Sequence, residues 1–173
     1  MKDYWLAKLI SSVEEVDSRK RLQKAIYLLQ LAGCPLKCDY LLHYYGPYSF
    51  ELAGLINQLD GANIIKEIPE PLPTGVVKYR SMVTEKGTKI LNSFETTKNG
   101  RQLCNAIGPF IPRFQKLNEK NPWILELAAT AAYYHDDNWQ VAQQQTAAFK
   151  RIPENDNNLK KAIQLAKSFK KSA

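Results

Sequence analysis

Two neighbouring stretches decide the fold: RKRLQKAIYLLQLAG at residues 19–33 and LLHYYGPYSFELAGLINQL at residues 41–59. Apolar residues recur in the first stretch at three- and four-residue steps, the spacing of a buried helix face, at Leu22, Ala25, Ile26, Leu28 and Leu29. Asp17 or Ser18 can cap the start of this helix, and Gly33 can end it. The first stretch therefore predicts a buried helix.

The second stretch predicts an extended segment, a sharp corner and another helix. Residues 39–45 are too few and too aromatic for a helix, so we expect extended backbone there. The dipeptide Gly46-Pro47 turns the chain. We expect Pro47 to lie in the first turn of the next helix, with Ser49 nearby, and this helix to run to about Leu59.

A hairpin is expected next. Residues 63–68 and 76–83 favour β-structure, and the proline-rich segment PEPLPTG at residues 69–75 separates them. Because proline has no amide donor, we expect a loop that cannot pair tightly. With a first helix from Asp3 to about Val16, residues 1–96 predict a winged-helix-like core.

Residues 97–173 predict helices interrupted at prolines. Breaks are expected at Gly108-Pro109, Pro112, Asn121-Pro122 and Ile152-Pro153, and Asp156 or Asn157 can start the last helix. The expected fold class is mainly α with a small β-hairpin. A winged-helix-like core, residues 1–96, carries a C-terminal helical bundle, residues 97–173, packed on it as one unit.

Composition indicates a folded, cytoplasmic protein. Of the 173 residues, 45% are apolar and 24% are charged, close to the averages for globular domains. The N-terminus is charged at once, and no apolar run approaches the length of a membrane-spanning helix. The odd number of cysteines, Cys34, Cys38 and Cys104, favours reduced thiols.

The basic excess lies in the C-terminal half of the chain. The net charge is +7, made of +1 in residues 1–96 (12 Lys and Arg, 11 Asp and Glu) and +6 in residues 97–173 (12 and 6). Such an excess attracts nucleic acid through the long-range field and counterion release. A solvated, lysine-rich helix surface explains the same count, and both interpretations stay open.

A second basic feature lies at the start of the helix at residues 19–33. Cations in a first turn oppose the helix dipole, so something must outweigh their cost. Either they form a patch that faces phosphate or acid, or Glu14, Glu15 and Asp17 neutralise them. The helix at residues 49–59 carries no Lys or Arg, so nucleic acid would rely on this cluster and the hairpin. The predicted nucleic-acid-binding residues are Arg19, Lys20, Arg21, Lys24, Lys66, Lys78 and Arg80.

The densest aromatic stretch predicts a partner-binding surface. Tyrosine combines apolar area with a polar tip, which suits interfaces as well as base stacking. The predicted partner-binding residues are Tyr44, Tyr45, Gly46, Pro47, Tyr48 and Ser49.

We predict no catalytic residue, metal or cofactor. Cys34 and Cys38 have a spacing that two zinc ligands could use, but a structural site needs four ligands, so we interpret them as packed thiols. We interpret His43 as a packed residue and His135 as the end of a helix. No glycine-rich loop and no nucleophile elbow is present.

These stretches resemble the YwgA-like bacterial proteins and, more distantly, the Panacea (SocA-like) antitoxin domain. The matching segments are RKRLQKAIYLLQ, HYYGPYSFEL, VTEKGTKIL and LELAATAAYY, and the shared motif falls on Leu22, Gln23, Lys24, Tyr27 and residues 45–49. The resemblance implies a helical domain with a small hairpin and no known catalysis. For Panacea domains it implies neutralisation of toxins by direct contact.

Two functions are expected. The first is a non-enzymatic, winged-helix-like regulator that binds nucleic acid. The alternative is a protein-interaction module of antitoxin or defence-accessory type, which binds a partner such as a toxin through the aromatic Gly-Pro corner. An enzyme that uses His43 or His135 ranks last. Whether the last helix folds back or exchanges with another protomer in a homodimer is left open.

Overall fold

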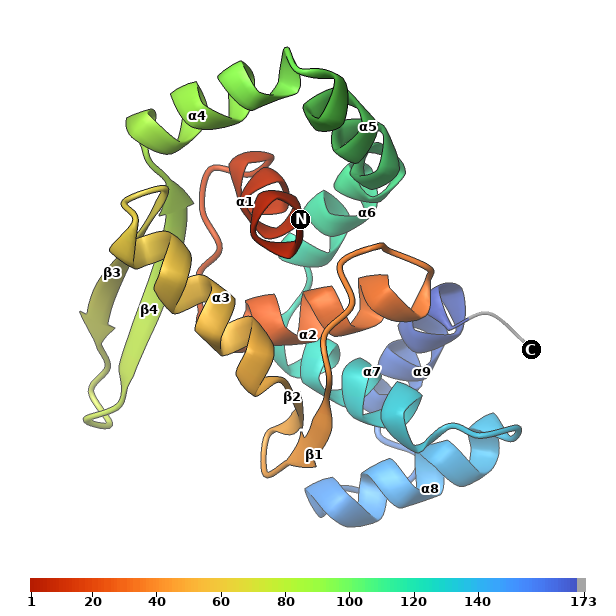
Figure 1. The fold of residues 1–173 in the computed structure, drawn as a ribbon. Coiled ribbons are helices and arrows are strands. Elements are labelled where there is room, and N and C mark those ends of the chain that lie inside the picture. Colours follow the sequence, from red (N-terminus) through yellow and green to blue (C-terminus); the bar gives the residue numbers. More distant parts are fainter. Residues whose placement is uncertain (171–173) are drawn as a thin grey trace.

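The computed structural model describes residues 1–170 and is mainly helical, with two short antiparallel hairpins (Figure 1). The first part of the chain forms α1 (Lys2–Ser11), α2 (Arg19–Leu31), β1 (Leu41–His43), β2 (Gly46–Tyr48), α3 (Phe50–Gly61), β3 (Ile65–Pro71) and β4 (Val77–Val83). The second part forms α4 (Glu85–Glu95), α5 (Lys98–Ile107), the 3-10 turn η1 (Gly108–Phe110), α6 (Ile111–Asn118), α7 (Pro122–Tyr134), α8 (Trp139–Lys150) and α9 (Asn157–Phe169). The predicted fold class is confirmed, while residues 171–173 of the predicted C-terminal region lie outside the described residues.

Side-chain caps fix the starts of several helices, and most of these starts lie where the sequence placed them. The hydroxyl of Ser18 accepts a hydrogen bond from the amide of Arg21, Ser49 accepts from Leu52, and Asp156 begins α9 in the same way. Thr84 and Asn121 cap α4 and α7. Each such cap is worth about 1 kcal/mol. These local signals explain why most of the predicted helix starts are confirmed.

The first helix is shorter than predicted, and the reason is tertiary. It ends at Ser11, and Val16 instead forms a bridge with Ser81 of β4, through backbone hydrogen bonds of 2.8 and 2.9 Å. Val16 is fully buried there, so extended backbone buries more apolar area than another helical turn would. Val16 thus lies in a short extended segment between α1 and α2, and this segment pairs with β4. This pairing completes the winged-helix-like order of elements.

The corner of the β1–β2 hairpin also differs from the prediction. His43 pairs with Gly46, so Tyr44 and Tyr45 form the two-residue turn, and Pro47 lies in β2 instead of a helical turn. Gly46 has φ of 94°, in the left-handed region that glycine tolerates best. The predicted extended segment is confirmed, but the chain turns two residues earlier than expected.

The β3–β4 hairpin, which we call the wing, pairs further than predicted. Pro69 and Pro71 belong to β3, and the turn is closed by a 2.8 Å hydrogen bond from the amide of Leu72 to the carbonyl of Val76. The prediction of a loose proline-rich loop was therefore wrong. On an edge strand, alternate amides point away from the partner strand, so prolines two residues apart can avoid the ladder.

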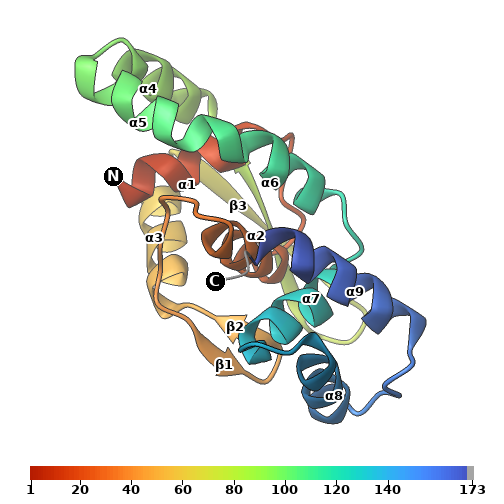
Figure 2. The same cartoon turned by 90° about the vertical axis from the view of Figure 1, so that its right-hand side faces the viewer.

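Helix α2 lies at the centre of one continuous core. It contacts β2 and β4 as well as α6, α7 and α9 (Figures 1 and 2). Helices α5 and α6 run beside α1, and α9 lies across α7 (Figure 2). Buried apolar residues come from both parts of the chain, so the C-terminal helices pack directly on the core. Within residues 1–170, every helix is too short or too polar to cross a membrane.

Candidate functional site

A groove with a volume of about 590 Å³ opens between α2, α3 and the two hairpins. We call it the hairpin groove. Its lining combines cations from α2 and aromatic side chains from both hairpins. The groove lining includes Arg19, Lys20, Lys24, His43, Tyr45, Gly46, Tyr48, Val76, Val77, Lys78 and Tyr79.

The groove joins two sets of residues that the sequence predicted separately. From the predicted nucleic-acid-binding set it contains Arg19, Lys20, Lys24 and Lys78, and from the predicted partner-binding set Tyr45, Gly46 and Tyr48. The predicted residues that do not line it are Arg21, Lys66, Arg80, Tyr44, Pro47 and Ser49. The sequence does not indicate the apolar side of the wing, because Val76, Val77 and Tyr79 are residue types that any strand contains.

The polar residues of α2 hold the Gly-Pro corner by its backbone. The side-chain amide of Gln23 donates to the carbonyl of Ser49 (2.8 Å) and accepts from the amide of Ser49 (2.9 Å). The ammonium of Lys24 donates to the carbonyl of Pro47 (2.7 Å). A side chain at Gly46 would place its Cβ 2.7 Å from the hydroxyl of Thr130. These contacts give a physical reason for the paired motifs at residues 22–24 and 46–49.

Aromatic side chains lie in the groove and next to it. Tyr44 and Phe50 are 77% and 68% exposed. The ring of Tyr48 lies 5.7 Å from that of His43 and 5.1 Å from that of Phe50, measured between centroids. Within residues 1–170, most exposed large apolar side chains lie on the β1–β2 hairpin, the start of α3 and the wing. His43 is exposed, so the interpretation of it as a packed residue was wrong.

Arg19 and Arg21 contact groups of the protein itself. The guanidinium of Arg19 pairs with the carboxylate of Glu67, with Nε 2.6 Å from Oε2, and lies 5.2 Å from the ring centroid of Tyr79. Arg21 is buried and pairs with Asp17 (2.7 Å). Burial alone would raise the pKa of Asp17, but the hydrogen bond and the charge of Arg21 outweigh this effect, so the pKa lies below its ordinary value. Both arginines therefore tie α2 to its surroundings.

The cations of the wing are mostly paired as well. Arg80 contacts Glu15 at 2.8 Å and Glu70 at 3.5 Å, and Lys78 contacts Glu70 at 3.5 Å. Lys66 is exposed, and within residues 1–170 it has no carboxylate within 4 Å. Of the carboxylates that balance these cations, Glu70 lies on the wing itself, whereas Glu15 comes from the segment between α1 and α2.

A buried charge cluster lies behind the groove. Glu126 of α7 is 2% exposed, and its two oxygens lie 2.6 Å from Nζ of Lys20 and 3.1 Å from Nζ of Lys150. Lys24 is equally buried, and burial lowers its pKa to about 8. We call Lys20, Lys24, Lys150 and Glu126 the Glu126 cluster. With its lysines protonated it has three positive charges and one negative charge.

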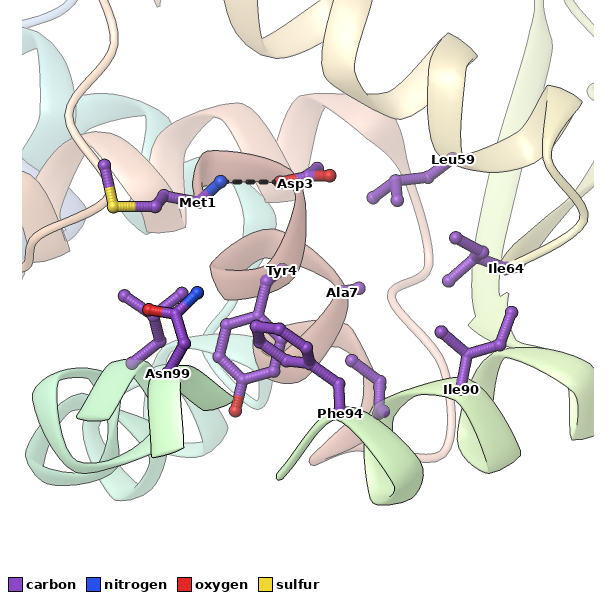
Figure 3. Close-up of a pocket in the computed structure, with 11 residues that line it drawn as sticks. Met1, Asp3, Tyr4, Ala7, Leu59, Ile64, Ile90, Phe94 and Asn99 are labelled. Carbon is purple, nitrogen blue, oxygen red and sulfur yellow. Dashed lines mark hydrogen bonds and ion pairs between the residues drawn. The ribbon is translucent and has the colours of Figure 1, made fainter. Parts of the chain in front are cut away.

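A second pocket, with a volume of about 360 Å³, lies between α1, α4 and α5, and we call it the N-terminal cleft. Figure 3 shows Tyr4 of α1 and Phe94 and Ile90 of α4 among the residues that line it. The amino group of Met1 pairs with Asp3 at 3.0 Å (Figure 3). Its lining contains no Lys or Arg.

The cysteines show no metal-site arrangement. Cys34 and Cys38 are buried free thiols, and burial raises the pKa of each to about 11. No group of three His, Cys, Asp or Glu side chains suited to a metal ion is present among residues 1–170.

Comparison with known proteins gives one informative relative. No family model matches the chain. Over 129 residues, the chain is 30% identical to a Bacillus subtilis (strain 168) protein described as "Uncharacterized protein YwgA", and the alignment covers 75% of this chain and 72% of the Bacillus protein. The more distant resemblance to the Panacea domain stays a prediction.

Proposed function

The chain belongs to the YwgA-like family, and we propose that it is a protein-binding module that holds a segment of a partner protein in the hairpin groove. One observation carries this proposal: exposed aromatic and aliphatic side chains gather on three elements around a single groove. Aromatic side chains are enriched at protein interfaces, and large contiguous apolar patches are uncommon on monomeric proteins. The antitoxin or defence-accessory role is a narrower form of the same proposal.

The charges around α3 support a protein partner over nucleic acid, the function that the sequence favoured. The exposed residues of α3 include Glu51, Asn57 and Asp60, and the helix has no Lys or Arg. Arg19 and Arg21 already contact carboxylates of the protein itself, at Glu67 and Asp17. A phosphate backbone would have to compete with these pairs, whereas an apolar segment would not.

The groove has a suitable size for anchoring side chains. Its volume of about 590 Å³ lies within the ~300–1,000 Å³ typical of ligand sites. Interfaces are dominated by a few buried aromatic and aliphatic anchors, surrounded by contacts that exclude water. Tyr45 and Tyr48 on one side and Tyr79 on the other provide walls for such anchors.

The proposal is tested by affinity purification from the native host with quantitative mass spectrometry. Wild-type protein is compared with Tyr45→Ala and Tyr79→Ala, both of which remove exposed side chains that line the groove. The matched control is Val141→Ala, an exposed apolar residue of α8 away from the groove. We expect a partner in near-stoichiometric amount that both groove variants lose and the control retains. If every partner survives both groove substitutions, the proposal is wrong.

Nucleic acid is tested separately with labelled duplex DNA and single-stranded RNA in a fluorescence anisotropy titration. We expect no binding that depends on the predicted cations. Binding that weakens steeply from ~50 to ~200 mM salt, and that is lost when Lys66, Lys78 and Arg80 are replaced by alanine, would support the nucleic-acid regulator instead.

A further inference from the structure

The Glu126 cluster holds more positive charge than the protein balances. Both oxygens of Glu126 are occupied, one by Lys20 and the other by Lys150. Among residues 1–170, Lys24 has no carboxylate within 4 Å, and its only hydrogen bond goes to the carbonyl of Pro47. An ammonium group has three donors, so Lys24 keeps unused capacity for an acceptor.

Burial makes this imbalance costly. Lys24 is 2% exposed, and a buried charge without a counter-ion is strongly unfavourable. The neighbouring charges of Lys20 and Lys150 add repulsion, while Glu126 offsets only part of it. A second anion beside Lys24 would offset both the cost of burying its unpaired charge and the repulsion from Lys20 and Lys150.

The excess positive charge of the Glu126 cluster lies next to the hairpin groove. Lys20 and Lys24 both line the groove, whereas Glu126 and Lys150 do not. The side chain of Lys20 is 45% exposed, and its ammonium lies 4.9 Å from the ring centroid of Tyr45. Apolar side chains of the wing, such as Val76 and Tyr79, line the same groove. An anionic group and an apolar group could therefore be bound side by side.

We infer that the partner segment presents a carboxylate next to an aromatic or aliphatic side chain, and that this carboxylate pairs with Lys20 and Lys24 in the hairpin groove. The inference rests on the proposed function and narrows it. Its basis is charge complementarity: the groove offers cations that the protein leaves partly unbalanced, and the anion that an unmodified protein segment carries is a carboxylate. The carboxylate comes either from an Asp or Glu side chain or from a chain terminus.

The test is selection of a random twelve-residue peptide library against the full-length protein. We expect the enriched peptides to contain Asp, Glu or a free C-terminal carboxylate beside an aromatic or aliphatic residue. The selected peptide is then measured against Lys20→Met and Lys24→Met, with Lys161→Met as the control, because Lys161 is exposed on α9 outside the groove. We expect each groove variant to weaken binding by about tenfold or more, and the control to leave it unchanged.

Two further arms identify the source of the carboxylate. Replacing Asp or Glu of the selected peptide by Asn or Gln tests the side chain, and amidating the peptide tests its C-terminus. Thermal melts accompany each variant. If Lys24→Met does not fold, Lys20→Met decides the outcome, because its side chain is partly exposed.

The outcomes separate this inference from the proposed function. Peptides that lose binding in Tyr45→Ala but keep their affinity for the wild type when Asp and Glu are replaced and the C-terminus is amidated overturn the inference and leave the protein-binding function standing. Peptides that bind the lysine variants as tightly as the wild type do the same. A library that yields no peptide sensitive to Tyr45→Ala overturns both.

Discussion

The hairpin groove and the N-terminal cleft are both lined by helices and apolar side chains, but they differ in how their charges are balanced. In the cleft, the amino group of Met1 pairs with Asp3, and the hydroxyl of Tyr4 donates to Glu95, which lies outside the cleft lining and pairs with Lys8. Beside the groove, Lys20 and Lys150 share the buried carboxylate of Glu126, and within residues 1–170 Lys24, which lines the groove, has no carboxylate within 4 Å. Both are concave, so it is the unbalanced charge beside the hairpin groove, more than its shape, that distinguishes it as a candidate binding site from the N-terminal cleft.

The largest expected effect lies on the cleft side. A Cβ at Gly100 would lie 1.9 Å from the carbonyl oxygen of Phe94, so Gly100→Ala forces the backbones of α4 and α5 apart. We expect a loss of about 3 kcal/mol or more in the free energy of unfolding, measured by chemical denaturation. Gly108→Ala is the control, because nothing lies within 4 Å of its Cβ. Equal stability of the two variants would mean that α4 and α5 are not in close contact.

The next effect lies at the groove and tests the clamp on the corner. Gln23→Leu leaves the buried amide of Ser49 without a partner, while the carbonyl of Ser49 still accepts from the amide of Ala53. An orphaned buried group costs about 1–3 kcal/mol, so we expect a loss of about that size in stability. Gln58→Leu, an exposed position on α3, should be close to neutral. A neutral Gln23→Leu would show that the corner does not depend on α2.

The charge imbalance of the groove should appear as a pH dependence. The pKa of Lys24 is lowered to about 8 in the folded protein, below its ordinary value of 10.5. Between these values the unfolded chain binds more protons, so the penalty at this position is full below pH 8 and shrinks as pH rises. Relative to Lys24→Met, the wild type should gain on the order of 1 kcal/mol from pH 7 to pH 9.

This dependence is measured by urea denaturation of both proteins at each pH. Taking the difference between them cancels the titration of the other lysines and tyrosines. A difference that stays constant from pH 7 to pH 9 would show that Lys24 is as well solvated as a surface lysine, and would remove the contrast between groove and cleft.

The smallest expected effect separates binding from stability. Tyr45 is 56% exposed, so Tyr45→Ala should change the free energy of unfolding by no more than about 0.5 kcal/mol. Phe114→Ala, fully buried in α6, should cost about 3–5 kcal/mol in the same assay. If Tyr45→Ala destabilises the fold by a similar amount, its loss of partner binding could not be assigned to the groove.

Local signals explain how much of the fold the sequence could predict. Caps such as Ser18 and Thr84 act within three residues, so the starts of α2 and α4 follow from the sequence. The end of α1 depends on Val16 meeting Ser81, which lies 65 positions away and gives no local signal. The prolines of β3 were misinterpreted because their position on an edge strand depends on the sheet.

The candidate site was predictable in part for the same reason. The sequence indicated the cations of α2 and the aromatic corner, because each set is contiguous. It left open whether Glu14, Glu15 and Asp17 balance the cations of α2. Asp17 pairs with Arg21, but the other carboxylates come from β3 and α7, at Glu67 and Glu126. That Lys20 faces Glu126, and that Lys24 has no carboxylate beside it, depends on how α7 packs against α2.

Polar side chains of α2 hold the segment before α3 by hydrogen bonds to its main-chain atoms. Gln30 bonds both the carbonyl and the amide of Cys38, as Gln23 does at Ser49, and Lys24 bonds the carbonyl of Pro47. The tip of the hairpin, Tyr44 and Tyr45, is exposed between these anchors. The tip can therefore vary in evolution without refolding the domain. Under the proposed function, exchanging these two side chains would change which partner one scaffold binds.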